Sequence, residues 1–190
     1  SCFSLLSLKI KIMKHTLYIS YLFIFILLTS CGGEVDTPSG DGFDRKELLE
    51  NATENIIIPT HNNLLNTLIN LQNRLNDFSS NINSDNLSQL RSAWYSSYKA
   101  WQYVEMFNIG KAEEIYYSLK MNSYPTNASR IETNLLLPIE NIDLDYQDNN
   151  LSSQGFPALD YLLYGIANDS TQVLSVYTSE NGIKYINYME

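Results

Sequence analysis

The residues that could do acid–base or metal chemistry in this chain are almost all carboxylates. Beyond residue 30, the 190-residue sequence contains one cysteine, Cys31, and one histidine, His61. A single cysteine allows no disulfide within one chain, and this pair cannot supply the several sulfur or imidazole ligands of a zinc site. A serine triad would have to use His61, and no G-x-S-x-G turn accompanies it. Catalysis or metal binding would therefore depend on Asp and Glu side chains.

Glu105 is the first candidate, because it falls in line with large apolar residues. At about 100° per residue, a helix over 86–107 puts Glu105 on its most aromatic face. The other members of that face are Leu87, Leu90, Trp94, Tyr98 and Trp101. A buried carboxylate is costly unless it is hydrogen-bonded, ion-paired or bound to a cation. Glu105 is therefore either a satisfied structural group at the helix end or part of a functional pocket. His61 is expected to be structural.

Asp160 is the second candidate, in the apolar segment 155–165 (GFPALDYLLYG). Pro157 suits the first position of a helix there, and Gly165 suits its C-terminal cap. Asp160 would then lie in the first turn, where the helix dipole stabilises a negative charge. The helix dipole alone would therefore explain an acidic residue at this position, without any ligand.

The N-terminal region has the pattern of a lipoprotein signal peptide. Residues 13–30 start with Met-Lys and hold an apolar run at 17–28, which is too short to span a bilayer core of about 30 Å. The sequence LTSCG at 28–32 resembles the bacterial lipobox, in which the cysteine accepts diacylglycerol. Cys31 is therefore the predicted lipid attachment site, through which the protein would bind a membrane. Gly32 is not typical of an inner-membrane retention signal, so we expect the outer membrane, on either face.

This pattern divides the chain into four parts. Residues 1–12 precede the first plausible initiator and are interpreted as a non-native upstream extension, followed by the signal peptide at 13–30. Residues 31–43 are rich in Gly and acidic residues, as expected of a flexible tether. Residues 44–190 form the predicted folded domain, which the pattern indicates is incomplete at its C-terminal end.

The charge of the chain argues against nucleic acid as a partner. The sequence has 21 acidic and 12 basic residues, and three of the basic ones lie in the first thirty positions. Proteins that bind nucleic acid meet its phosphates with Lys and Arg. We therefore expect no nucleic-acid partner.

Helical periodicity runs through the folded domain, and no segment alternates as a strand would. Helices are predicted over 59–78, 86–107, 113–120, 127–137 and 157–165, and from 178 or 179 to 190. Pro59 either opens the first helix or bends a longer one that starts near Asp44. Ser84 and Asp85 are the expected N-cap of the second helix. The polar segment 141–154 is expected to be a loop. The predicted fold class is all-α, a helical bundle.

Several of these residues together resemble the imelysin family. The pattern W…W…E-x-F…G of one family helix is matched by Trp94, Trp101, Glu105, Phe107 and Gly110. The segment 155–165 is similar to the family signature G-x-H-x-x-E-Y-L-L-x-G. Order and spacing agree over residues 48–190, which correspond to the N-terminal half of an imelysin-like domain.

The resemblance implies an all-α fold of two helical bundles with a functional cleft between them, in an exported or outer-membrane protein. It also implies metallopeptidase activity or a role in bacterial iron uptake. Within the signature, Gly155 is retained, Pro157 stands in place of the histidine, and Asp160 replaces the glutamate. The proline removes an imidazole that could bind metal or relay protons, so hydrolysis is not expected from the residues present.

Three functions stay open. The preferred one is a lipid-anchored, non-catalytic binding protein of the cell envelope, linked to iron uptake and taking an iron species or a peptide. Glu105 and Asp160, near Trp101, would then offer oxygen ligands to a divalent or ferric cation. The second is a metallopeptidase with a degenerate motif, whose missing ligand comes from a further part of the protein. The third is a scaffold lipoprotein without a ligand.

Overall fold

The computed structural model describes residues 42–138 and 150–190. Within these ranges the regular secondary structure is helical and contains no strand, which confirms the predicted all-α class. Cys31, the upstream extension, the signal peptide and nearly all of the tether lie outside the described ranges, as does most of the predicted 141–154 loop. In the described part of the chain, no helix is long and apolar enough to cross a membrane.

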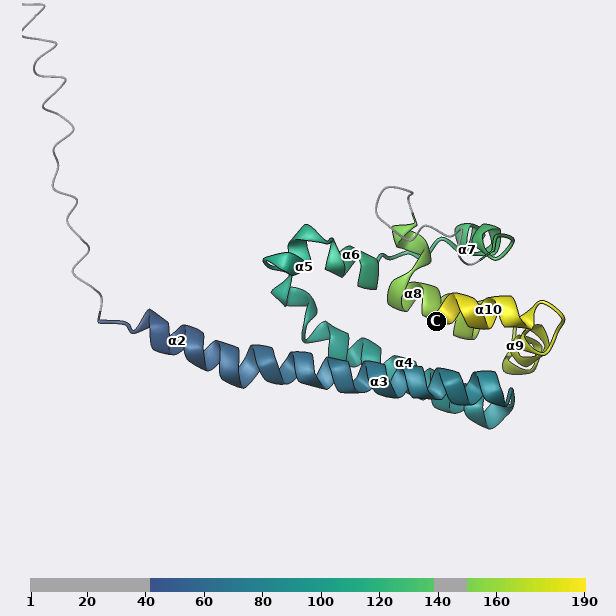
Figure 1. The fold of residues 1–190 in the computed structure, drawn as a ribbon, viewed down its shortest axis with the longest axis horizontal. Coiled ribbons are helices and arrows are strands. Elements are labelled where there is room, and N and C mark those ends of the chain that lie inside the picture. The colour runs from purple at the N-terminus through teal and green to yellow at the C-terminus, as the bar shows by residue number, and fades with distance from the viewer. Residues whose placement is uncertain (1–41, 139–149) are drawn as a thin grey trace, which may run out of the picture. The chain divides into compact units, whose positions relative to one another are not determined.

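The first helical path runs from Arg45 to Ser80 in three continuous parts (Figure 1). These are α2 (Arg45–Ala52), a π-helical turn η1 (Thr53–Ile57) and α3 (Ile58–Ser80). Proline cannot donate the backbone hydrogen bond that a helix requires, and π-helical turns accommodate such local breaks. Pro59 is the second residue of α3, one residue beyond the end of η1. The longer helix starting near Asp44 is thus the alternative observed.

The second long helix, α4 (Ser84–Gln102), runs back along α3 to form a helical hairpin (Figure 1). Its N-cap is Asn83, whose Oδ1 accepts a hydrogen bond from the Asn86 backbone N–H at 2.9 Å. The predicted N-cap at Ser84 and Asp85 is therefore wrong by one or two residues. Both of those residues already belong to the helix.

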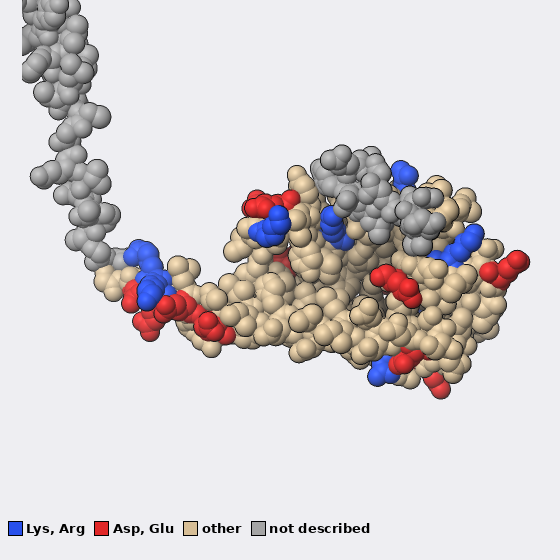
Figure 2. Space-filling model, in the orientation of Figure 1, with Lys and Arg blue, Asp and Glu red and all other residues tan. Residues whose placement is uncertain are grey.

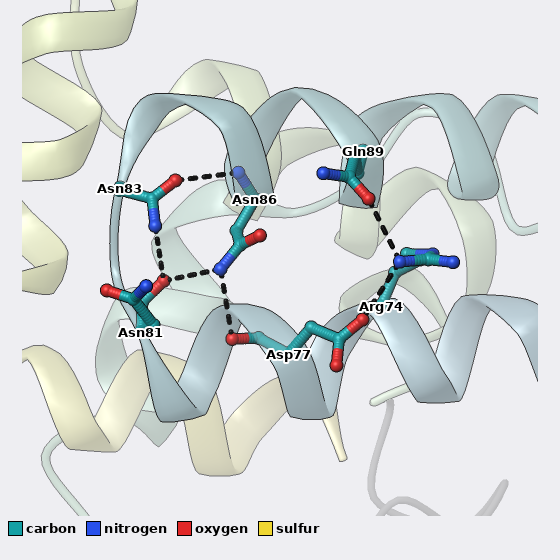
Figure 3. A network of polar contacts seen from close by, with 6 residues as sticks. All are labelled: Arg74, Asp77, Asn81, Asn83, Asn86 and Gln89. Atoms are coloured by element: carbon teal, nitrogen blue, oxygen red, sulfur yellow. Dashed lines mark hydrogen bonds and ion pairs between the residues drawn. The ribbon is translucent and has the colours of Figure 1, made fainter.

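Polar side chains close the hairpin between α3 and α4 (Figure 3). The Asn86 amide donates to the backbone oxygens of Asp77 and Asn81, at 3.2 and 2.8 Å. Arg74 donates to the Asp77 carboxylate and to the Gln89 side-chain oxygen, both at 2.9 Å. The Asn86 bonds thus bind backbone oxygens at the C-terminal end of α3, and the Arg74 bonds link side chains of the two helices.

Helix α4 ends at Gln102, five residues before the predicted end at Phe107. The backbone N–H of Val104 donates to the Trp101 carbonyl at 2.8 Å, which tightens the chain into a turn. A short 3₁₀ helix, η2 (Glu105–Phe107), follows. Gly110 then adopts φ +59°, which lets the chain reverse into α5 (Lys111–Glu114). Glu105 therefore does not continue the face of α4.

The segment after α5 differs from the single helix predicted over 113–120. Tyr116 takes a left-handed conformation with φ 55° and separates α5 from α6 (Tyr117–Met121). Helix α7 (Ala128–Asn134) lies within the predicted 127–137, and Asn127 caps it by accepting from the Arg130 N–H at 2.9 Å.

The remaining helices pack on the same side of the α3–α4 hairpin as α5 and α6 (Figure 1). They are η5 (Leu151–Ser153), α8 (Gly155–Asp160), the π-helical turn η6 (Tyr161–Gly165), α9 (Ser170–Tyr177) and α10 (Gly182–Met189). Helix α9 was not predicted, and α10 starts three or four residues later than expected. The cap of α9 is Asp169, whose carboxylate accepts from the Gln172 N–H at 2.9 Å.

The signature segment folds differently from the prediction at both ends. Helix α8 begins at Gly155, so Pro157 is its third residue and Asp160 its sixth, beyond the first turn. The dipole argument for Asp160 is therefore wrong. Gly165 ends a π-helical turn without a positive φ, so it is not a left-handed C-cap.

The segment formed by α8 and η6 joins all three clusters of the core. Phe156 packs with residues of α3 and α4, Leu162 packs with α7, and Leu163 packs with α3, α4, α9 and α10. All three side chains are at most 2% exposed. The central position of this segment explains why its sequence is so apolar.

Two side chains of α4 hold this segment in place. The Trp94 indole N–H donates to the Phe156 carbonyl at 3.1 Å. Arg91 Nε donates to the Leu163 carbonyl at 3.0 Å, and Arg91 Nη1 reaches the Ser170 hydroxyl at 2.7 Å. A π-helical turn leaves carbonyls without their usual helical partners, and Arg91 satisfies one of them.

Gly155 is required where α8 approaches α6. Its φ is +74°, and a Cβ at this position would lie 2.4 Å from the backbone oxygens of both Lys120 and Met121. Any side chain would therefore strain the backbone and overlap α6. This explains physically why the signature begins with glycine.

Candidate functional site

A cavity of about 320 Å³ lies where α3, the end of α4, η2 and α5–α6 meet. We call it the Glu105 cavity. It is lined by His61, Trp101, Val104, Glu105, Phe107, Asn108, Ala112, Ile115 and Tyr117. Two of the predicted site residues, Glu105 and Trp101, thus share one cavity.

Two buried polar atoms on the residues around this cavity lack partners. Within the described ranges, neither the Trp101 indole N–H nor the Asn108 Oδ1 has a hydrogen-bond partner. Trp101 is 1% exposed, and its ring meets Tyr117 edge-on at 5.4 Å. A buried polar group without a partner costs about 1–3 kcal/mol. A ligand that accepts from Trp101 and donates to Asn108 would recover part of that cost.

Glu105 and His61 add ionisable groups to the same cavity. Glu105 is half-buried and has no ion-pair or hydrogen-bond partner among the described residues. His61 Nδ1 lies 2.8 Å from the Ile57 carbonyl, which can only accept, so Nδ1 carries the proton. In the neutral ring Nε2 is then left as an acceptor. The ring also contacts Phe107, with centroids 5.9 Å apart.

The predicted buried face of α4 is correct in part. Leu87, Leu90 and Trp101 are at most 2% exposed, whereas Trp94 and Tyr98 are half-buried. Glu105 is not on this face, because α4 ends before it. The carboxylate reaches the cavity from a 3₁₀ turn and remains partly accessible.

A second pocket, of about 140 Å³, contains the signature residues Pro157 and Asp160. We call it the Asp160 pocket. Its other lining residues are Trp94, Tyr98, Asn122, Tyr124, Thr126 and Phe156. Partial burial raises the pKa of Asp160 above its usual value. The structure gives the carboxylate no ion-pair partner among the residues it describes.

Glu105 and Asp160 therefore line different pockets. The rings of Trp101, on the first pocket, and Phe156, on the second, lie 6.4 Å apart. The structure does not bring the two carboxylates together around one cation.

The metallopeptidase chemistry implied by the resemblance requires about three protein ligands around a zinc ion. Between residues 42 and 138 and between 150 and 190, no three His, Cys, Asp or Glu residues are grouped so that they could hold a metal ion. The Asp160 pocket offers one carboxylate, and Pro157 occupies the position of the signature histidine. The residues described there do not fit such a zinc site.

Three polar residues of the cavity, Asn108, Tyr117 and His61, were not recognised from the sequence as site residues. Asn108 and Tyr117 reach the Glu105 cavity only because the chain turns after Gln102, and no spacing in the sequence signals that turn. His61 was expected to be structural. It does bond to its own helix, but it also lines the cavity.

The helical hairpin, with shorter helices packed on one side, defines an all-α protein, in which the Glu105 cavity and the Asp160 pocket lie at the ends of α4 and α8. The family model described as Imelysin (Peptidase M75) matches residues 57–189, and the chain belongs to this family. The matched range contains both pockets. No curated protein and no solved structure matches the chain.

Proposed function

We propose that this imelysin-family protein binds a small ligand in the Glu105 cavity and does not hydrolyse peptides. The proposal rests on three polar groups of the cavity that have no partner among the described residues. The unpaired N–H of Trp101 and the unpaired Oδ1 of Asn108 belong to residues that line the same cavity as an unpaired carboxylate. Natural proteins rarely leave buried polar groups unpaired without a functional reason. Such an arrangement is typical of a site whose partner is a ligand.

The donor atoms of the cavity favour an iron species as that ligand. A carboxylate oxygen, an imidazole nitrogen and an amide oxygen are suitable ligands for iron, and Glu105, His61 and Asn108 supply them. Of these three residues, only Glu105 and His61 would be strong ligands, which is too few for a bare ion. A chelated ion that keeps some of its own ligands therefore fits better. The Trp101 N–H would donate to an oxygen of the chelator.

The cellular part of the proposal rests on the sequence. Lipid attachment at Cys31 would anchor the domain to the outer membrane through the 31–43 tether. Metabolic labelling with a palmitate analogue tests this, with Cys31→Ser as the control. We expect label on the parent protein and none on the variant. Label on both would contradict the assignment.

Two other functions are separable by assay. The family description favours a metallopeptidase, in which case the protein would cleave unfolded substrates with added Zn²⁺ and Asp160→Asn would abolish turnover. Since Pro157 replaces the signature histidine, we expect no cleavage. A scaffold lipoprotein would bind no small ligand at all.

Calorimetric titration of the mature chain with ferric citrate tests the binding proposal. Removing a charge-assisted contact costs about 1.5–3 kcal/mol, so Glu105→Gln should weaken binding by about tenfold or more. The matched control is Glu113→Gln, an exposed acid on neighbouring α5, which should bind normally. Equal binding by the parent and Glu105→Gln, or no binding by either, would contradict the proposal.

A further inference from the structure

The Asp160 pocket differs chemically from the Glu105 cavity. Four aromatic side chains line it: Trp94, Tyr98, Tyr124 and Phe156. The only formally charged residue among its lining residues is Asp160, and its other polar side chains are Asn122 and Thr126. The pocket therefore combines aromatic walls with one negative charge.

The aromatic walls are held rigidly. The Trp94 indole donates to the Phe156 carbonyl at 3.1 Å, which fixes the plane of the ring. Tyr98 stacks on Trp94 with a centroid distance of 5.6 Å and an interplanar angle of 6°. Phe156 meets Tyr98 at 60° and 5.5 Å and is 2% exposed. Because these rings are already ordered, ligand binding would cost little side-chain conformational entropy.

The charge of Asp160 is left uncompensated. No Lys or Arg is among the described residues that line the pocket. The arginine of α4, Arg91, donates to Leu163 and Ser170 and covers the Tyr164 ring at 4.4 Å. An acidic chain also attracts cations in general, and this one has a formal charge of −9.

We propose that the Asp160 pocket binds an organic ammonium ion, such as the methylated ammonium group of a small molecule. Aromatic faces attract cations that carry apolar substituents, and a nearby carboxylate supplies the counter-charge. A volume of about 140 Å³ equals that of roughly four or five water molecules, which suits a tetramethylammonium-sized group. A hydrated metal ion would instead require several oxygen ligands, and most of the wall is hydrocarbon.

This site is independent of the function proposed for the Glu105 cavity. The two are separated by the Trp101 and Phe156 rings and have different ligand chemistry. Figure 2 shows side chains of both signs at α2, around α5 and at the far end of the long helices, with a largely uncharged surface along the middle of those helices. A general surface attraction for cations would therefore not concentrate at one pocket.

The test is a titration of the mature chain with tetramethylammonium chloride, at constant ionic strength, followed by ¹H–¹⁵N NMR. The chain has two tryptophans, and both are described, so each indole resonance reports on one site. We expect the Trp94 resonance to shift in a saturable way and the Trp101 resonance to stay within error. Neopentyl alcohol, which has a similar shape and no charge, should bind at least several-fold more weakly.

Three variants complete the test. Asp160→Asn should weaken tetramethylammonium binding about tenfold, and Tyr124→Ala should weaken it several-fold. Tyr124 is 87% exposed, so its removal should not impair folding. Asp85→Asn makes the same charge change at an exposed position in the first turn of α4 and should bind like the parent.

Any of four results would overturn the proposal. They are no saturable shift of Trp94, equal binding by the parent and Asp160→Asn, equal binding of neopentyl alcohol, or a Trp94 shift with Mg²⁺ but not with tetramethylammonium. The last would indicate a metal site. Thermal unfolding of each variant confirms that a loss of binding is not a loss of fold.

Discussion

Replacing Gly155 by alanine should destabilise the protein more than the same change at another glycine with a positive φ. Gly155 has φ +74°, and an added Cβ would lie 2.4 Å from two backbone oxygens of α6. A non-glycine residue in such a backbone conformation costs about 1–3 kcal/mol. Overpacking against atoms that cannot move aside adds about 1–3 kcal/mol. A total near 4 kcal/mol corresponds to a Tm lower by roughly 8–16 °C for a domain of this size.

Gly110→Ala is the matched control for this prediction. Gly110 also has a positive φ, +59°, but a Cβ there would meet nothing within 4 Å. Only the backbone cost applies, about 1–3 kcal/mol, so the loss in Tm should be about half as large. Thermal unfolding followed by circular dichroism at neutral pH measures the Tm of both variants. Equal losses in the two would refute the claim that contact with α6, rather than backbone conformation alone, makes Gly155 necessary.

Three further predictions concern single side chains. Ser97 is fully buried and its hydroxyl has no partner among the described residues. Ser97→Ala should therefore raise the free energy of unfolding, measured by urea titration, by about 1 kcal/mol. A lower free energy of unfolding in the variant would mean that the hydroxyl is hydrogen-bonded. Tyr177 donates to the Leu162 carbonyl at 2.9 Å, and burial raises the pKa of its hydroxyl. Since tyrosine in the unfolded chain ionises near pH 10, the stability of the protein should fall above that pH. The fall should be less steep in Tyr177→Phe. Partial burial also raises the pKa of Asp160, so the folded state holds its proton to higher pH than the unfolded state and the carboxylate destabilises the fold above that range. Asp160→Asn should therefore raise Tm at pH 7 but not at pH 3, and an equal rise at both would contradict this reasoning.

The class of fold followed from the sequence because helical periodicity and capping residues are local. The buried Leu87, Leu90 and Trp101 of α4 were predicted from spacing alone. Helix α9 was missed although a local signal exists, since Asp169 and Gln172 have the spacing of a capping box. That pair marks the start of the helix.

The candidate site was only partly predictable because it depends on where α4 ends. Extending the helical face past Gln102 placed Glu105 in the core, whereas the turn at Val104 brings it to a cavity. Helix propensity does not forecast this ending, which tertiary packing decides. The sequence also suggested one site with two carboxylates, whereas the structure places Glu105 and Asp160 in different pockets.

The signature segment shows why a motif position does not fix its chemistry. Pro157 and Asp160 occupy the places of the family histidine and glutamate, yet the pocket around them is mainly aromatic. Its glycine, in contrast, is explained by backbone geometry and by contact with α6. The retained residue thus serves the fold, while the exchanged residues alter what the pocket can bind.

If the Glu105 cavity binds an iron species as proposed, the metal can be located directly by diffraction. The most direct test is a crystal of the mature protein soaked in ferric citrate, with diffraction data collected on both sides of the iron absorption edge. We predict one anomalous peak inside the cavity, within bonding distance of the Glu105 carboxylate, that is absent from crystals of Glu105→Gln. A peak at Asp160 instead, or no ordered iron in either pocket, would contradict the claim.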